Sequence, residues 1–217
     1  MAAICDDVYA EDSLDAAQVT ELRIAHDRAS ENLVRAFGTV RSSPLVLFCR
    51  TAACKIGFGA PPRAATSEDL GFASAQVVLD DGSVPPSAVV VTGPVGGTAR
   101  ILTHELVHAE MKAWVAYDAL PTWFNEGTAT FIANEPSCAA DAGPPVALDV
   151  TRLTTKRAWQ RHLETSGGTR ETYCAARREV ETWMMQFGTN HLRAEALRTL
   201  MLAVANGTPF DRAFRRE

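Results

Sequence analysis

Three residues in the middle of the chain have the types and spacing of a metal-dependent catalytic site. His104, Glu105 and His108 form the pattern H-E-x-x-H. On an α-helix, residues four apart share one face, with Cβ atoms about 5–6 Å apart. The two imidazoles can therefore reach one ion, and neutral imidazole is a good ligand for Zn²⁺. Glu105 lies about 100° further around such a helix, where it would flank the ion and serve as general base toward a zinc-activated water.

The segment that carries this pattern has the composition of a buried helix. Gly97 is a helix breaker and Thr98 a plausible N-cap. The apolar residues after them recur at helical spacing: Ile101, Leu102, Leu106, Val107, Met111, Trp114 and Val115. Because these residues cover most of the helix circumference, we expect the helix to be buried. Buried histidines and a buried glutamate need partners, and one metal ion can serve the set; the alternative is a pair of ordinary core histidines.

A second segment, residues 121–133, offers the third ligand that the first helix lacks. Pro121 suits the first turn of a helix, and Trp123 and Phe124 begin an apolar surface. Glu126 lies among these apolar residues, where a carboxylate is costly unless it is paired or binds a metal. We therefore expect Glu126 to be a metal ligand, with a favourable contact to the helix dipole as the simpler alternative. Gly127 would allow another helix or a substrate to approach closely.

Taken together, H-E-x-x-H, a short connection and P-x-W-F-N-E-G-T-A resemble the gluzincin metallopeptidases, and most of all the compact peptidase MA-like family. The resemblance implies that His104, His108 and Glu126 bind zinc and that Glu105 is the general base for hydrolysis of a peptide or protein substrate. In that family a tyrosine or histidine beyond the third ligand stabilises the oxyanion. Tyr173 fits by kind and order, with His191 as its competitor and a core tyrosine as the alternative.

This sequence departs from the gluzincin pattern at two points. Seventeen residues separate His108 from Glu126, one fewer than in many gluzincins, so the connection must be slightly tighter. Thermolysin-like enzymes carry an aspartate four residues after the glutamate to orient a ligand histidine, and Thr130 occupies that position here. The metzincin pattern does not fit, because Met111 and Trp114 stand where it requires a glycine and a third histidine.

The elements around these motifs predict an α+β fold of the zincin-like type. We expect a small N-terminal β-sheet packed on the H-E-x-x-H helix, followed by a mainly helical C-terminal part. A length of 217 residues suits one domain, 1–217, with lobes at 13–98 and 99–217. Helices are expected near 13–37, 98–115, 121–133, 151–164, 169–187 and 190–204, and a short one after 208. Strands are expected at 44–49, 75–79 and 88–92, and a loop at 54–71. The resemblance implies that an edge strand holds the substrate, with 72–79 and 88–92 as candidates; an ordinary structural strand is the alternative for both.

Composition limits the partners and the compartment. A formal charge of −5 argues against nucleic acid, and no apolar run has the length of a transmembrane segment. The beginning, Met1-Ala-Ala-Ile-Cys5, reads as a mature start behind an added methionine, as in a periplasmic or secreted protein without its signal peptide. Two bridges, Cys49 with Cys54 and Cys138 with Cys174, would fit an oxidising compartment; five reduced thiols in a cytosolic protein are the alternative.

Two other functions compete with a zinc metallopeptidase. The chain can be a non-catalytic, zinc-containing module that binds peptides or serves as a scaffold. It can also be a zinc amidase that acts on a non-peptide substrate such as a cell-wall fragment. Structural zinc sites usually have four protein ligands, and three are found here, which favours catalysis.

Overall fold

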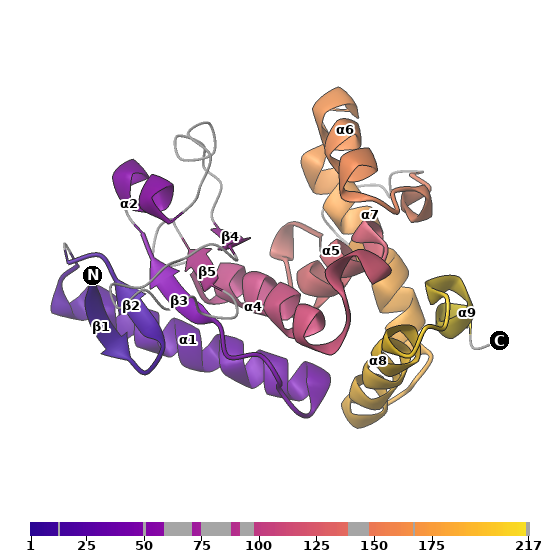
Figure 1. Ribbon diagram of the computed structural model, residues 1–217, viewed down its shortest axis with the longest axis horizontal. Coiled ribbons are helices and arrows are strands. Elements are labelled where there is room, and N and C mark those ends of the chain that lie inside the picture. Colours follow the sequence, from indigo (N-terminus) through magenta and orange to yellow (C-terminus); the bar gives the residue numbers. More distant parts are fainter. Residues whose placement is uncertain are drawn as a thin grey trace. The chain divides into compact units, whose positions relative to one another are not determined.

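The computed structural model describes residues 1–12, 14–49, 51–58, 71–74, 88–91, 98–138, 148–166 and 168–215. In this part of the chain the fold is α+β, mostly helical with one small sheet (Figure 1). Contacts divide the chain into two units, Met1–Glu31 with Ser42–Ala109 and Asn32–Arg41 with Glu110–Glu217. The division falls within helices α1 (Ala16–Phe37) and α4 (Thr98–Trp114), so each unit contains part of both.

The first unit contains a five-stranded sheet with the order β1-β2-β3-β5-β4. Its strands are β1 (Ala2–Cys5), β2 (Val8–Ala10), β3 (Leu45–Phe48), β4 (Gly71–Ser74) and β5 (Ala88–Val91). The three central strands β2, β3 and β5 run parallel, and the edge strands β1 and β4 pair antiparallel to their neighbours. β3 is buried along its whole length, as expected for a central parallel strand with a continuous apolar sequence.

The sheet confirms two expected strands and corrects one expected role. β3 and β5 lie where strands were predicted at 44–49 and 88–92, whereas 75–79 lies outside the described residues. β5 pairs with β3 on one side and β4 on the other. Because both of its edges are already paired, the suggestion that 88–92 receives an extended substrate is wrong. β4 is an edge strand and keeps one open side in the described sheet.

Helix α1 has the expected apolar stripe, and a capping box that was not predicted begins it. Asp15 and Gln18 form a reciprocal capping box, in which each backbone N–H donates to the other's side chain, at 2.9 and 3.1 Å. Its buried residues recur every three or four positions: Leu22, Ala25, Ala29, Leu33 and Phe37. Gly38 ends the helix with φ +73°, a conformation that glycine adopts without steric cost.

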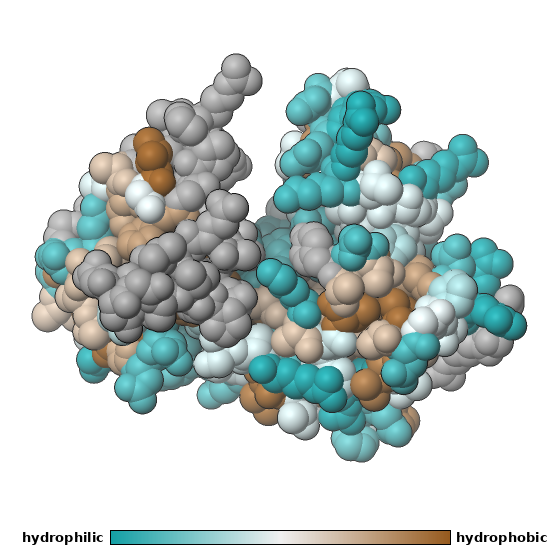
Figure 2. Space-filling model, in the orientation of Figure 1, coloured by the Kyte–Doolittle hydropathy of each residue, from teal (hydrophilic) through white to brown (hydrophobic). Residues whose placement is uncertain are grey.

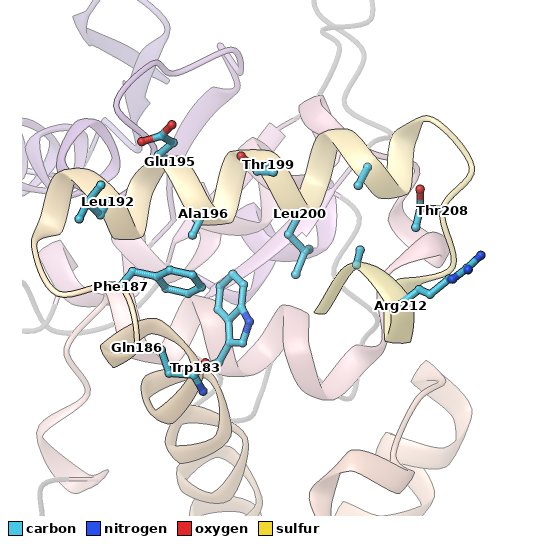
Figure 3. Close-up of a pocket in the computed structure, with 12 residues that line it drawn as sticks. Trp183, Gln186, Phe187, Leu192, Glu195, Ala196, Thr199, Leu200, Thr208 and Arg212 are labelled. Carbon is cyan, nitrogen blue, oxygen red and sulfur yellow. The ribbon is translucent and has the colours of Figure 1, made fainter. Parts of the chain in front are cut away.

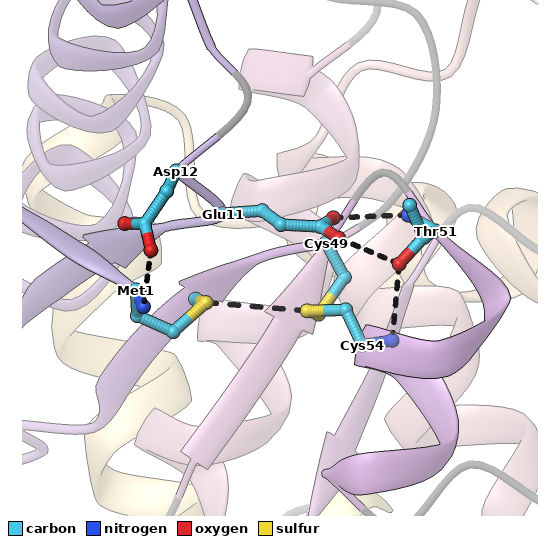
Figure 4. A network of polar contacts seen from close by, with 6 residues as sticks. All are labelled: Met1, Glu11, Asp12, Cys49, Thr51 and Cys54. Atoms are coloured by element: carbon cyan, nitrogen blue, oxygen red, sulfur yellow. Dashed lines mark hydrogen bonds and ion pairs between the residues drawn. A yellow bond between two sulfur atoms is a disulfide. The ribbon is translucent and has the colours of Figure 1, made fainter.

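A short helix, α2 (Ala52–Gly57), replaces the beginning of the loop that was expected at 54–71. Thr51 caps it, because the Thr51 hydroxyl accepts the Cys54 backbone N–H at 3.1 Å. Glu11 in turn accepts both the backbone N–H and the hydroxyl of Thr51, and the Cys49–Cys54 disulfide joins β3 to α2 (Figure 4). Local side-chain bonds and a disulfide therefore hold a segment whose composition alone indicated a loop.

The second unit is helical in its described part. Its elements after α4 are η2 (Tyr117–Ala119), α5 (Thr122–Ile132), η3 (Pro136–Cys138), η4 (Val150–Arg152), α6 (Lys156–Ser166), α7 (Thr169–Met185), α8 (Asn190–Ala205) and α9 (Phe210–Arg215). The helices expected from residue 121 onward are present, although the one predicted at 151–164 begins at Lys156 behind the 3₁₀ turn η4. Among the helices in the described ranges, none has the length and hydropathy that a membrane span requires.

Candidate metal centre

Helix α4 positions the H-E-x-x-H residues. His104 is half-buried and His108 is buried, with 8% of its surface exposed. Their rings meet edge to face, with centroids 4.7 Å apart and the two Nε2 atoms 3.1 Å apart. The i, i+4 spacing has thus brought one ring nitrogen of each histidine to a common point, as the sequence predicted.

Helix α5 carries Glu126. The first backbone N–H groups of this helix form hydrogen bonds with backbone carbonyls from further along the chain. The N–H groups of Thr122 and Trp123 donate to the carbonyls of Thr154 and Leu153, at 3.0 and 3.2 Å. These are among the N–H groups that a helix cannot satisfy within its own first turn. The segment before α6 therefore fixes where α5 begins. It also fixes the position of Glu126 along the helix axis, one turn later.

An aromatic cluster fixes the rotation of α5. Trp123 and Phe124 make edge-to-face or tilted contacts with Phe210, and both also contact Phe214, at ring-centroid distances of 5.0–5.9 Å. The Trp183 indole stacks on Phe214 and its N–H donates to the Phe214 carbonyl at 3.1 Å. Such ring pairs contribute about 0.5–1.5 kcal/mol each beyond their buried area. These contacts hold the rotation of α5, and Glu126 is half-buried on the same helix.

Gly127 lets α5 pack closely against α7 (Figure 1). A Cβ atom at this position would lie 2.7 Å from the carbonyl carbon of Ala176 and 2.9 Å from a methyl group of Val180. Both distances are shorter than side chains tolerate. The sequence left open whether a helix or a substrate approaches Gly127, and the structure assigns α7 to that space.

The three expected ligands come together. One ligand atom each from His104, His108 and Glu126 lie within 4.8 Å of one another, so the group can bind a metal ion. Two imidazole nitrogens and one carboxylate oxygen are a common donor set for catalytic zinc. Two imidazole nitrogens that bind one zinc ion at the usual Zn–N distance and at a tetrahedral angle lie about 3.3 Å apart. The Nε2 atoms of His104 and His108 lie 3.1 Å apart, which is close to that separation. The donor set and this separation therefore fit zinc.

The close Nε2 pair also makes metal binding depend on protons. At 3.1 Å the two nitrogens are within hydrogen-bond distance, and one N–H can lie between them. A metal ion needs a lone pair from each ring, so it must displace that proton. A metal ion therefore competes with protons for the two ring nitrogens.

Glu105 and Thr130 occupy different surroundings. Glu105 is half-buried on α4, where it directly follows His104. Thr130, at the position where thermolysin-like enzymes have an aspartate, donates its hydroxyl to the backbone carbonyl of Glu126 at 2.8 Å. This bond stays within α5.

Glu110 is a supporting residue that the sequence did not single out. It is fully buried on α4, two residues after His108. Its carboxylate accepts the backbone N–H of Arg41 at 2.9 and 3.0 Å and the indole N–H of Trp114, and the Arg41 guanidinium lies 3.4 Å over the Trp114 ring. These bonds tie the second half of α4 to the segment that follows α1. A glutamate inside an otherwise apolar helix is a signal that could have indicated such a role.

Tyr173 and His191, the two candidates for the oxyanion donor, lie on α7 and α8. Tyr173 is half-buried and its ring meets Trp159 of α6 edge to face, with centroids 5.2 Å apart. His191 is exposed in the first turn of α8. Tyr173 therefore has a packing contact of its own, and the role of either residue in catalysis stays a prediction.

A large cavity lies elsewhere in the second unit and includes none of these residues. It has a volume of about 740 Å³ and lies between the end of α7, α8 and α9. Figure 3 shows Trp183, Phe187 and Leu200 facing it, while Glu195 and Arg212 point away. Apolar surface is also visible around α8 and α9 in Figure 2. The chemistry-bearing residues, and not this cavity, define the candidate site.

Comparison of the chain with protein-family models, with curated proteins and with solved structures finds no match.

Proposed function

We propose that the protein is a zinc metallopeptidase of gluzincin type, similar to the peptidase MA-like family. One observation carries the proposal: His104, His108 and Glu126, from two successive helices, bring one ligand atom each within 4.8 Å of the others. Three protein ligands leave a position for water and substrate, which is the usual arrangement in catalytic zinc sites.

Each component of the proposed site has its own chemical role. When bound, zinc would supply a Lewis acid that lowers the pKa of water and polarises the scissile carbonyl. Glu105 would accept the proton of the attacking water and pass it to the leaving amine. Tyr173, or His191 in its place, would donate a hydrogen bond to the developing oxyanion. The open edge of β4 would receive an extended peptide through main-chain hydrogen bonds.

The proposed compartment is extracytoplasmic, either periplasmic or secreted. The Cys49–Cys54 and Cys138–Cys174 disulfides support it, because disulfides persist mainly in oxidising compartments.

The test compares zinc content and peptide hydrolysis in the wild type, Glu105→Gln and Glu126→Ala. We expect about one zinc per wild-type chain, clearly less in Glu126→Ala, and full zinc without hydrolysis in Glu105→Gln. The exposed Glu164 on α6 provides the control, since Glu164→Gln should change neither quantity.

Two outcomes would contradict the proposal in different ways. A folded wild type that neither contains nor takes up zinc would leave His104 and His108 as core residues. If the wild type contained about one zinc per chain but hydrolysed no peptide in a broad library, the non-catalytic module would be favoured. Cleavage of cell-wall amides alone would favour the amidase.

A further inference from the structure

We propose that a second, basic cavity in the helical unit binds a small organic carboxylate. The cavity has a volume of about 150 Å³ and is lined by residues of α1, α5, α7 and α8. Its polar lining residues include Arg35, Asn190 and Arg193, and its apolar lining residues include Phe131, Ile132 and Met184. These residues all belong to the unit formed by Asn32–Arg41 and Glu110–Glu217.

The contact between α1 and α8 next to this cavity is well defined. The Arg198 guanidinium of α8 donates to the backbone carbonyl of Phe37, the last residue of α1, at 3.1 Å. The same guanidinium closes over Gly38, where an added Cβ atom would collide with it. The end of α1 that carries Arg35 is thus fixed against the helix that carries Arg193.

Two arginines line the cavity, and no carboxylate of the described residues neutralises them. In the described part of the chain, neither Arg35 nor Arg193 lies within ion-pair distance of an aspartate or glutamate. Arg193 donates from Nη1 to the Oδ1 atom of Asn190 at 3.2 Å, while its Nε is buried and has no hydrogen-bond partner among the described residues. A guanidinium charge that no carboxylate neutralises favours an anion nearby, and the guanidinium N–H groups can donate to it.

The beginning of α8 adds to the positive potential. Asn190 is the first residue of this 16-residue helix, and Arg193 lies in its first turn. That turn contains no acidic residue, and the Thr189 side chain caps only the Leu192 N–H. The N-terminal end of a helix carries a partial positive charge and favours anions. The N-terminal end of α8 and the two arginines therefore both favour a negatively charged ligand.

The size and the apolar side of the cavity narrow the ligand to a short carboxylate. A volume of about 150 Å³ corresponds to about five water molecules in the liquid, enough for a carboxylate on a body of about three to five carbons. Phe131, Ile132 and Met184 would contact that body. The guanidinium fork matches the planar carboxylate and can donate two parallel hydrogen bonds to it.

The test is an NMR titration of the 217-residue chain as purified, with butyrate as the probe and neutral butyramide as its uncharged counterpart. Butyrate is expected to shift the Arg193 Nε–H resonance in a saturable way, and butyramide is not. Arg35→Gln and Arg193→Gln should each weaken butyrate binding by about ten- to a hundredfold. Arg161→Gln, at an exposed position of α6, is the matched control and should leave the affinity unchanged.

Several results would overturn the proposal. Absence of saturable butyrate binding in the folded wild type would do so directly. Butyrate binding that survives both arginine substitutions would place the anion elsewhere, for example at the metal group. Equal binding of butyramide would show a purely apolar pocket, and tighter binding of inorganic phosphate would replace the carboxylate. Arg35 is exposed, so Arg35→Gln keeps the test valid even where Arg193→Gln fails to fold. None of these results depends on hydrolysis, so failure of the metallopeptidase proposal is a separate outcome.

Discussion

At the scale of single residues, Tyr173 has a packing contact and a proposed chemical role that one substitution can separate. Its ring meets Trp159 edge to face at 5.2 Å, and Tyr173→Phe keeps that ring while removing the hydroxyl. If Tyr173 is the oxyanion donor, kcat is expected to fall about 10²-fold, with the urea unfolding midpoint nearly unchanged. Steady-state kinetics and unfolding curves of the same preparations measure the two effects.

His191→Gln is the companion variant, because His191 is the other candidate and is exposed. Its turnover number should equal that of the wild type. Normal turnover in Tyr173→Phe, together with a large loss in His191→Gln, would transfer the donor role to His191. Normal turnover in both variants would mean that neither residue stabilises the oxyanion.

Cys5 gives a prediction about pH. It is the one free cysteine of the five, and burial raises the pKa of its thiol, against the Arg23 charge that lowers it. A raised pKa means that less thiolate is present at a given alkaline pH, and thiolate is the reacting species. At about pH 8.5 we therefore expect iodoacetamide to alkylate Cys5 more slowly in the native chain than in urea. The difference should shrink at higher pH, as the native thiol also ionises. Equal native and unfolded rates across this range would contradict the shift.

The residues of the candidate metal group were predictable from the sequence, whereas the hydrogen-bond partner of Glu110 was not. His104, Glu105 and His108 are defined by their spacing on one helix, and Glu126 by its position in an apolar segment shortly afterwards. Glu110 bonds to the backbone N–H of Arg41, 69 residues away. A backbone donor has no side-chain signature, so sequence patterns do not reveal such a partner. The same limit applies to the carbonyls of Leu153 and Thr154 at the start of α5.

At the scale of elements, the contact of α5 with α7 through Gly127 determines where Glu126 stands. Gly127→Ala would place a methyl group against the Ala176 carbonyl, which belongs to helix backbone and cannot turn aside. The two helices must therefore separate, at a cost of about 1–3 kcal/mol in the free energy of unfolding. Because Glu126 is the neighbouring residue, we also expect weaker zinc binding. Urea unfolding and a competition assay with a zinc chelator measure both.

Gly57→Ala is the matched control, because a Cβ atom at Gly57 would meet no atom within 4 Å. Its free energy of unfolding should lie within about 0.5 kcal/mol of the wild-type value. If Gly127→Ala were as stable as Gly57→Ala and bound zinc normally, the close approach of α5 and α7 would not matter for the site.

The helices were more predictable than the strands, for a physical reason. Long helices such as α1 repeat their apolar stripe and carry caps, so many residues agree on one assignment. β1 and β2 have four and three residues, too few to show a period, and they were not predicted. Their pairing depends on partners distant in sequence, such as β3 for β2. α2 was missed because its stabilising contacts come from Glu11 and a disulfide, not from its own composition.

At the scale of the whole molecule, each unit has one disulfide, and the bridges are expected to differ in effect. Cys138–Cys174 spans 36 residues and Cys49–Cys54 spans 5. If a bridge acts mainly by restricting the unfolded chain, the longer one contributes about 4 kcal/mol and the shorter about 2 kcal/mol. Replacing both cysteines of a pair with alanine should lower the free energy of unfolding by about these amounts.

The tryptophans allow the two units to be followed separately. All four, Trp114, Trp123, Trp159 and Trp183, belong to the second unit, so their fluorescence reports on that unit, whereas far-UV circular dichroism reports on both. Cys138→Ala/Cys174→Ala is expected to shift the fluorescence transition, and Cys49→Ala/Cys54→Ala to shift only the dichroism. Equal shifts of both signals in both variants would mean that the chain unfolds as a single cooperative unit, with α1 and α4 transmitting the loss across the division that they span.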